Sequence, residues 1–99
     1  MIIVTGHARM KPGALTALRE EMGAMVTASR AEEGCIGYSY GIDTMDPDRM
    51  LVLEYWKDEA ALQAHFAEPH MKTWRAALAG NVVELDVKFG DASGLKPIG

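Results

Sequence analysis

MLVLEYW, residues 50–56, is the stretch of this sequence that best predicts the fold. Alternate residues of a β-strand face opposite sides of a sheet, and both sides of this segment are apolar apart from Glu54. An antiparallel sheet with one solvated face would alternate apolar and polar residues instead. We therefore expect helices to cover one face of this strand and a second copy of the chain to cover the other, which predicts a homodimer.

Three further strands and three helical segments flank this stretch. Strand patterns occupy 2–9, 36–43 and 82–89, and helical patterns occupy 14–31, 58–67 and 69–79. Gly34 is expected to cap the first helix, while Asp58 and Pro69 begin the two later ones. The order β-α-β-β-α-β predicts an α+β, ferredoxin-like fold, with helices on one face of an antiparallel sheet.

Length and composition restrict the class of protein. The chain has 99 residues, enough for one domain over 1–90 followed by an irregular tail over 91–99. Its formal net charge is −4 and its basic residues are scattered, so we expect no nucleic-acid partner. No apolar run approaches the roughly 20 residues that span a membrane. A single cysteine, Cys35, and no signal-peptide pattern favour the cytoplasm.

Glu54 and Trp56 share one face of the central strand, and a carboxylate there must be paired or protonated. Either it is a structural tie, or it acts as a buried acid or base or orients a histidine. His65 lies at the flank of the buried side of its helix. His70 shares a helix side with Trp74. Either histidine alone is typical of a structural or surface role, but the two flank one short connection, which favours a site.

Two strands add candidates for the walls of a pocket. His7 lies on a polar face of the first strand, which indicates either a pocket wall or exposure near the strand end. Tyr38 and Tyr40 share a face of the second strand, where they can belong to the core or hold a flat aromatic ligand. No phosphate-binding or metalloprotease motif is present. His65 and His70 are five residues apart with a proline between them, so we expect no metal site.

Six short pieces of the sequence, in this order and at this spacing, resemble the antibiotic biosynthesis monooxygenase family, which includes quinol monooxygenases. The pieces extend from the first strand to Leu78, about four-fifths of the chain. They are VTG at 4–6, KPG at 11–13, ASRAEEGC at 28–35 followed by Tyr38, LEYWKDEAAL at 53–62, AHF at 64–66 and PHM at 69–71.

The resemblance implies a dimeric α/β barrel, a pocket in each subunit between sheet and helices, and oxidation of phenols or quinols by O2 without flavin, haem or metal. By motif match, Glu54, Trp56, His65 and His70 are at positions that the family places in or near its pocket, and His7 matches more weakly. For a substrate with a flat ring, we expect Trp56, Tyr38 and Trp74 to form the slot that binds it. A haem-degrading branch of the fold holds iron through a histidine where this sequence has Trp74 and Arg75, so haem is not expected.

Dioxygen reacts slowly with closed-shell molecules, so a cofactor-free enzyme must first remove a phenolic proton with a base in a water-excluding pocket. His65 or His70 can be this base, and Glu54 can orient it. Two other classes of function stay open. One is an isomerase or mutarotase that moves protons on a small sugar or sugar phosphate. The other is a non-catalytic dimer that binds a small hydrophobic molecule.

Overall fold

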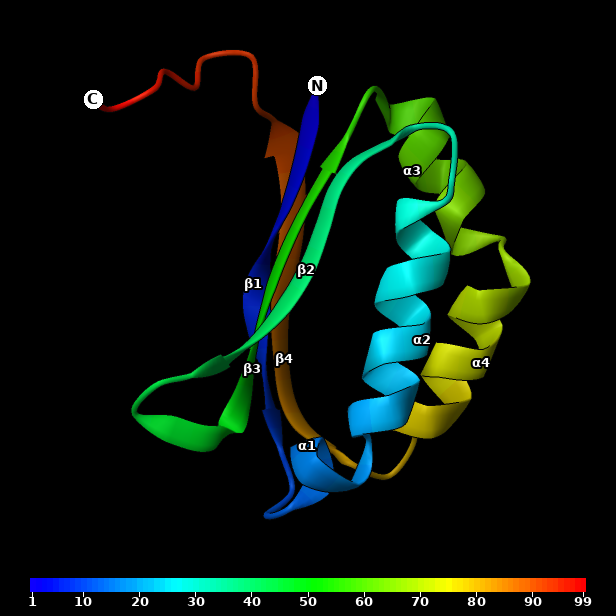
Figure 1. Ribbon diagram of the computed structural model, residues 1–99, viewed down its shortest axis with the longest axis vertical. Helices are drawn as coiled ribbons and strands as arrows, with labels where there is room; N and C mark the ends of the chain where they lie inside the picture. Colours follow the sequence, from blue (N-terminus) through cyan, green and yellow to red (C-terminus); the bar gives the residue numbers. More distant parts are fainter.

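The computed structural model describes all residues, 1–99, and has the ferredoxin-like architecture that the sequence predicts (Figure 1). Four strands form one antiparallel sheet in the order β2-β3-β1-β4, and the helices lie together on one of its faces. The elements are β1 (Ile2–Met10), α1 (Ala14–Ala17), α2 (Arg19–Arg30), β2 (Cys35–Asp43), β3 (Asp46–Trp56), α3 (Glu59–Phe66), α4 (Pro69–Leu78) and β4 (Val82–Asp91). None of these helices has the length and apolar character needed to cross a membrane.

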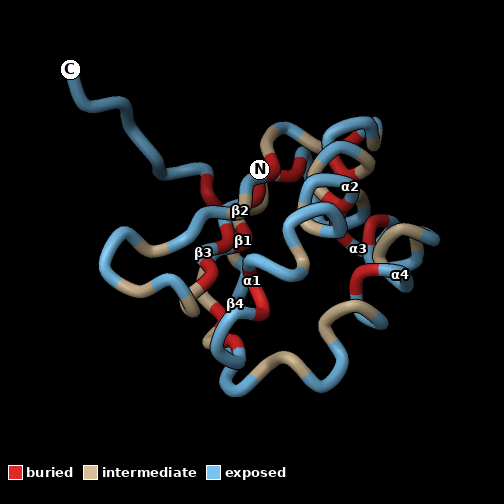
Figure 2. The backbone as a smooth tube through the Cα atoms, turned by 60° about the horizontal axis from the view of Figure 1, so that its bottom comes forward, coloured by how far each residue is buried: buried red, intermediate tan, exposed pale blue.

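Strand register fixes which side chains meet beneath the helices. Residues paired across antiparallel strands share a face of the sheet, and one such row runs Phe89, Val4, Glu54 and Tyr38 across all four strands. The adjacent row, two residues along, contains Tyr40 and the core residue Val52. Figure 2 shows that the buried positions gather in the strands and in the helices packed on them. The polar residue Glu54 is therefore part of the layer between sheet and helices.

The opposite face of the sheet has no helix on it (Figure 1). Its central positions include Leu51 and Leu53 of β3, which are 37% and 41% exposed. His7 pairs with Leu51 and so lies on this outer face. Within one chain, these apolar side chains remain in contact with solvent.

Two helix boundaries differ from the sequence prediction. The helix predicted over 14–31 is divided at Leu18, whose φ of −94° and ψ of 10° leave the helical region. A continuous apolar stripe cannot reveal a bend at one residue. Gly34 does not cap α2, because the helix ends at Arg30 with Ala31 as its cap. A Cβ atom on Gly34 would lie 2.3 Å from the Cβ of Ala61, so this glycine permits the loop after α2 to lie against α3.

The other boundaries are close to those predicted. The Asp58 side chain accepts a hydrogen bond from the Ala61 N–H, which makes it the N-cap of α3, and Pro69 opens α4. β3 begins at Asp46 rather than at Met50 because it continues through the hairpin with β2, and β4 extends to Asp91. No helix or strand follows, and the tail runs away from the sheet (Figure 1).

Candidate active site

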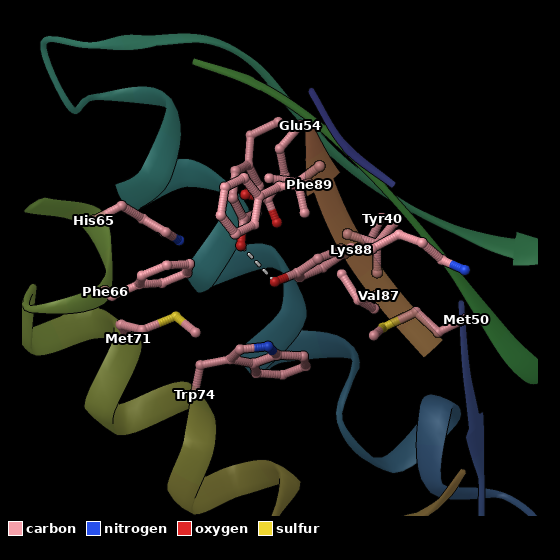
Figure 3. Close-up of a pocket in the computed structure, with 13 residues that line it drawn as sticks. Tyr40, Met50, Glu54, His65, Phe66, Met71, Trp74, Val87, Lys88 and Phe89 are labelled. Carbon is pink, nitrogen blue, oxygen red and sulfur yellow. Dashed lines mark hydrogen bonds between the residues drawn. The ribbon is translucent and has the colours of Figure 1, made fainter. Parts of the chain in front are cut away.

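A cavity of about 270 Å³ lies between the sheet and the helical layer. Figure 3 shows its two sides: His65, Phe66, Met71 and Trp74 come from α3 and α4, and Tyr40 is among those from the sheet. Most of the lining is apolar or aromatic, with Glu54 and His65 as its buried ionisable groups. This combination is typical of a site for a small, largely apolar molecule held by a few polar groups.

Aromatic rings form two sides of the cavity. Tyr40 and Trp74 are stacked, with ring centroids 5.5 Å apart and planes inclined by 23°. Tyr38 lies beside Tyr40, and their hydroxyl oxygens are 2.6 Å apart, a hydrogen bond drawn in Figure 3. Burial is the main cause that raises the pKa of both phenols, so both keep their protons at neutral pH. These hydroxyls can donate a hydrogen bond but are poor bases.

Glu54 enters the cavity from β3, between apolar neighbours, and is 6% exposed. Its Oε1 accepts a hydrogen bond from the indole Nε1 of Trp56 at 2.9 Å. Burial raises the pKa of the Glu54 carboxyl, and the Trp56 hydrogen bond opposes that rise. Trp56 itself is fully buried and is not part of the cavity wall. Trp56 is therefore not the substrate contact that the sequence predicts; in the structure it donates a hydrogen bond that holds Glu54.

His65 is the buried histidine of the cavity wall, with 1% of its surface exposed. Its Nδ1 lies 2.6 Å from Oε2 of Glu32, and its ring packs 4.6 Å from the Trp56 ring. A carboxylate can only accept hydrogen bonds, so we assign the proton of the neutral imidazole to Nδ1. Nε2 then carries a lone pair, and it makes no hydrogen bond to the protein. This nitrogen is able to accept a proton from a molecule in the cavity.

Glu32 was not among the candidates from the sequence, although it contacts both candidate histidines. It follows α2 in the loop that ends at Gly34, and its Oε2 also lies 2.8 Å from Nε2 of His70. Nothing in the sequence distinguishes Glu32 from Glu33 beside it. Its position becomes clear only in the structure, where the close approach of Gly34 to Ala61 lets the loop pack against α3.

Besides Trp56, three of the predicted site residues occupy places that differ from expectation. Glu54 was expected to orient a histidine, but Glu32 makes that contact. His70 is on α4 outside the cavity, where its nitrogen points at Glu32. His7 is on the uncovered face of the sheet and does not reach the cavity, because its strand position alternates away from the helices.

The predicted wall residues Tyr38 and Trp74 do line the cavity, together with residues that the sequence did not single out. The unpredicted side chains come from α3 and α4 and from β1, β3 and β4, and they include Phe66, Met71, Val87 and Phe89. In the sequence, an apolar residue that lines a cavity looks the same as one in a packed core, because both lie on the apolar side of an amphipathic helix or strand.

Comparisons with known proteins agree with this fold. The sequence model of the family described as antibiotic biosynthesis monooxygenase matches residues 1–77. The probable quinol monooxygenase YgiN of Escherichia coli K12 is 32% identical over 99 residues, which cover 90% of this chain and 95% of that protein.

Solved structures of related proteins superpose over nearly the whole chain. A crystal structure described as an antibiotic biosynthesis monooxygenase has a TM-score of 0.85 at 27% identity, covering 93% of this chain and 98% of the other. Protein PA3566 of Pseudomonas aeruginosa has a TM-score of 0.81 at 28% identity, covering 96% and 94%. The resemblance seen in the short sequence pieces thus extends through the fold, and the chain belongs to the antibiotic biosynthesis monooxygenase family.

Proposed function

We propose that this chain is a cofactor-independent monooxygenase that oxidises an electron-rich phenol or hydroquinone with dioxygen in the cavity. The observation that carries the proposal is the state of His65: its Nδ1 is held by Glu32, and its Nε2 is free on the wall of an aromatic cavity. The quinol monooxygenase relative points to the same substrate class.

In the proposed reaction, Nε2 of His65 takes the phenolic proton, and Glu32 stabilises the imidazolium that forms. The phenolate gives one electron to O2, and the radical pair combines to a peroxide at a ring carbon that bears hydrogen. The hydrogen on this carbon then leaves as a proton and the O–O bond breaks. The products of this step are a carbonyl at the ring carbon and water. One oxygen atom enters the product as the carbonyl and the other leaves in water. The substrate supplies all the electrons, so a hydroquinone becomes a hydroxyquinone without a further reductant.

Other side chains then bind and orient the substrate. The stacked rings of Tyr40 and Trp74 offer a flat surface for an aromatic ring. Glu54 is held by Trp56 at one oxygen and can hydrogen-bond a second substrate hydroxyl. The predominantly apolar lining favours such a ring over a sugar phosphate. His70 contributes through Glu32 rather than as the base itself.

Oxygen uptake with a panel of hydroquinones tests the proposal, together with 18O2 labelling of the product. His65→Gln should abolish uptake while its circular dichroism stays native. Gly94→Ala, a substitution in the C-terminal tail where a Cβ meets nothing within 4 Å, should leave uptake unchanged. Substrate conversion without oxygen uptake would identify an isomerase, and tight binding without any turnover would identify a binding protein; either result contradicts the proposal.

We also propose that the enzyme works as a homodimer, with the outer faces of two sheets in contact. The exposed leucines at the centre of that face, Leu51 and Leu53, support this arrangement. Burial of apolar surface contributes about 25 cal/mol per Å², and a domain of this size buries comparatively little surface on its own.

A further inference from the structure

The strongest unassigned feature is a cluster of three potential metal ligands beside the cavity. Glu32 comes from the loop after α2, His65 from α3 and His70 from the first turn of α4. Nδ1 of His65, Nε2 of His70 and a carboxylate oxygen of Glu32 all lie within 4.8 Å of one another. Three segments that are distant in the sequence therefore aim one ligand atom each at a common point.

The spacing of these atoms is close to that of a coordination shell. Metal–nitrogen bonds to histidine are about 2.0–2.1 Å long, which puts neighbouring ligand atoms roughly 3 Å apart. The two nitrogens now lie 2.6 and 2.8 Å from Oε2 of Glu32. Both contacts must lengthen to roughly 3 Å for an ion to enter between these atoms.

The chemical nature of the ligands selects the kind of ion. Two imidazoles and one carboxylate are a common ligand set for Zn²⁺ and related transition ions, and they leave a coordination position open for water. Ca²⁺ and Mg²⁺ prefer oxygen ligands and do not match a set that is two-thirds nitrogen.

One ligand of the cluster, Glu32, also lines a surface hollow of about 410 Å³. Its rim carries the carboxylates of Glu33, Asp58 and Glu68 against a single ammonium group, that of Lys57. The negative charge favours cations in this hollow.

We propose that Glu32, His65 and His70 form a binding site for a divalent transition-metal ion such as Zn²⁺. Coordination through Nδ1 requires the neutral His65 ring to keep its hydrogen on Nε2, the nitrogen that is free at the cavity. The metal-bound protein would then present a hydrogen-bond donor there instead of a base. Metal occupancy would switch off proton abstraction by His65. This consequence rests on the proposed function, whereas binding of the ion does not.

Titration of tag-free, chelator-treated protein with Zn²⁺ in a calorimeter tests the site without any substrate. We expect one ion per chain, and at least a tenfold increase in Kd for both Glu32→Gln and His70→Ala. Glu33→Gln and His7→Ala are matched controls, which change the neighbouring glutamate and a histidine of the outer face and should leave Kd unchanged. Binding that is substoichiometric, or unaffected by the first two substitutions, would overturn the proposal.

A second measurement uses the unmodified chain and so avoids any folding defect of a variant. In 15N-detected spectra, Zn²⁺ should shift the Nδ1 resonance of His65 and the Nε2 resonance of His70 and leave both His7 nitrogens in place. Unchanged His65 and His70 resonances at saturating Zn²⁺ would also refute the site. Loss of quinol-dependent oxygen uptake on addition of Zn²⁺ tests the proposed switch separately.

Discussion

In the proposed reaction, Glu32 controls how His65 reacts, although Glu32 does not itself line the cavity. Its carboxylate fixes the proton of the imidazole on Nδ1 and compensates the positive charge that appears when Nε2 accepts a proton. The same carboxylate also accepts from Nε2 of His70, so its orientation is held from two sides. The reactivity of the site thus depends on a loop residue outside it.

Replacement of Glu32 by glutamine should therefore lower kcat at least tenfold and change KM little. Glutamine keeps the size of the side chain but loses the charge, and its NH2 group can donate to Nδ1 and select the wrong tautomer. Steady-state oxygen uptake with a hydroquinone measures both constants. Glu33→Gln is the control, because Glu33 has no hydrogen bond to either histidine. Equal kcat values in the Glu32 variant and the parent would show that His65 acts without this partner.

Glu54 should make the folded chain less stable as the pH rises. Burial raises the pKa of this carboxyl in the folded state above its ordinary value of 4.5, so folding favours the protonated form. The stabilisation is complete below pH 4.5 and is lost as the pH rises through the folded-state pKa. Glu54→Gln keeps an acceptor for Trp56 without the ionisation. Thermal melts should show that the Tm advantage of Glu54→Gln over the parent increases from pH 4 to pH 8; a constant difference would contradict this reasoning.

At the scale of the elements, the sequence predicts helices and strands that have a periodic or capping pattern. It does not predict a helix break or a close contact that depends on a single residue. The apolar run at 50–56 and the caps at Asp58 and Pro69 locate β3, α3 and α4, although β3 begins earlier than the run does, because each is a local signal. The break at Leu18 has no such signal in a continuous apolar stripe. Glycine often ends helices, which predicts a cap at Gly34, whereas the absence of a Cβ at Gly34 makes space for Ala61.

The contact between Gly34 and Ala61 gives a prediction at this scale. Gly34→Ala would place a methyl group 2.3 Å from the Cβ of Ala61, so the loop and α3 must separate. We expect a loss of about 1–3 kcal/mol in the free energy of unfolding, as in other overpacked sites, and lower kcat because Glu32 moves from His65. Urea unfolding and oxygen uptake measure the two effects.

Two further variants show whether crowding is the cause. Ala61→Gly in the Gly34→Ala background removes the opposing methyl group and should restore part of the stability and activity. Gly94→Ala is the control, because a Cβ there meets nothing within 4 Å. If the double variant is no better than Gly34→Ala, the defect comes from the backbone of residue 34 and not from its contact with α3.

At the scale of the molecule, the fold could be predicted and the arrangement of the site could not. The order of strands and helices follows from patterns within ten or twenty residues. Glu32, in contrast, is 33 positions from His65 and 38 from His70, and only the packed chain brings them together. The outer position of His7 follows from strand alternation, but the sequence does not say which face of the first strand the helices cover.

The uncovered face of the sheet gives the prediction for the whole assembly. Leu53→Glu places a charge at the centre of this face, where pairing of two copies would bury it without a partner, at a cost of several kcal/mol. Because Leu53 is 41% exposed in the single chain, the substitution should leave the fold intact and convert dimers to monomers in sedimentation velocity. Met45→Glu, at an 89% exposed hairpin position, is the control and should remain dimeric. If the parent protein sediments as a monomer at micromolar concentration, the dimer is refuted. The face that carries Leu51 and Leu53 would then remain exposed to water without a second copy.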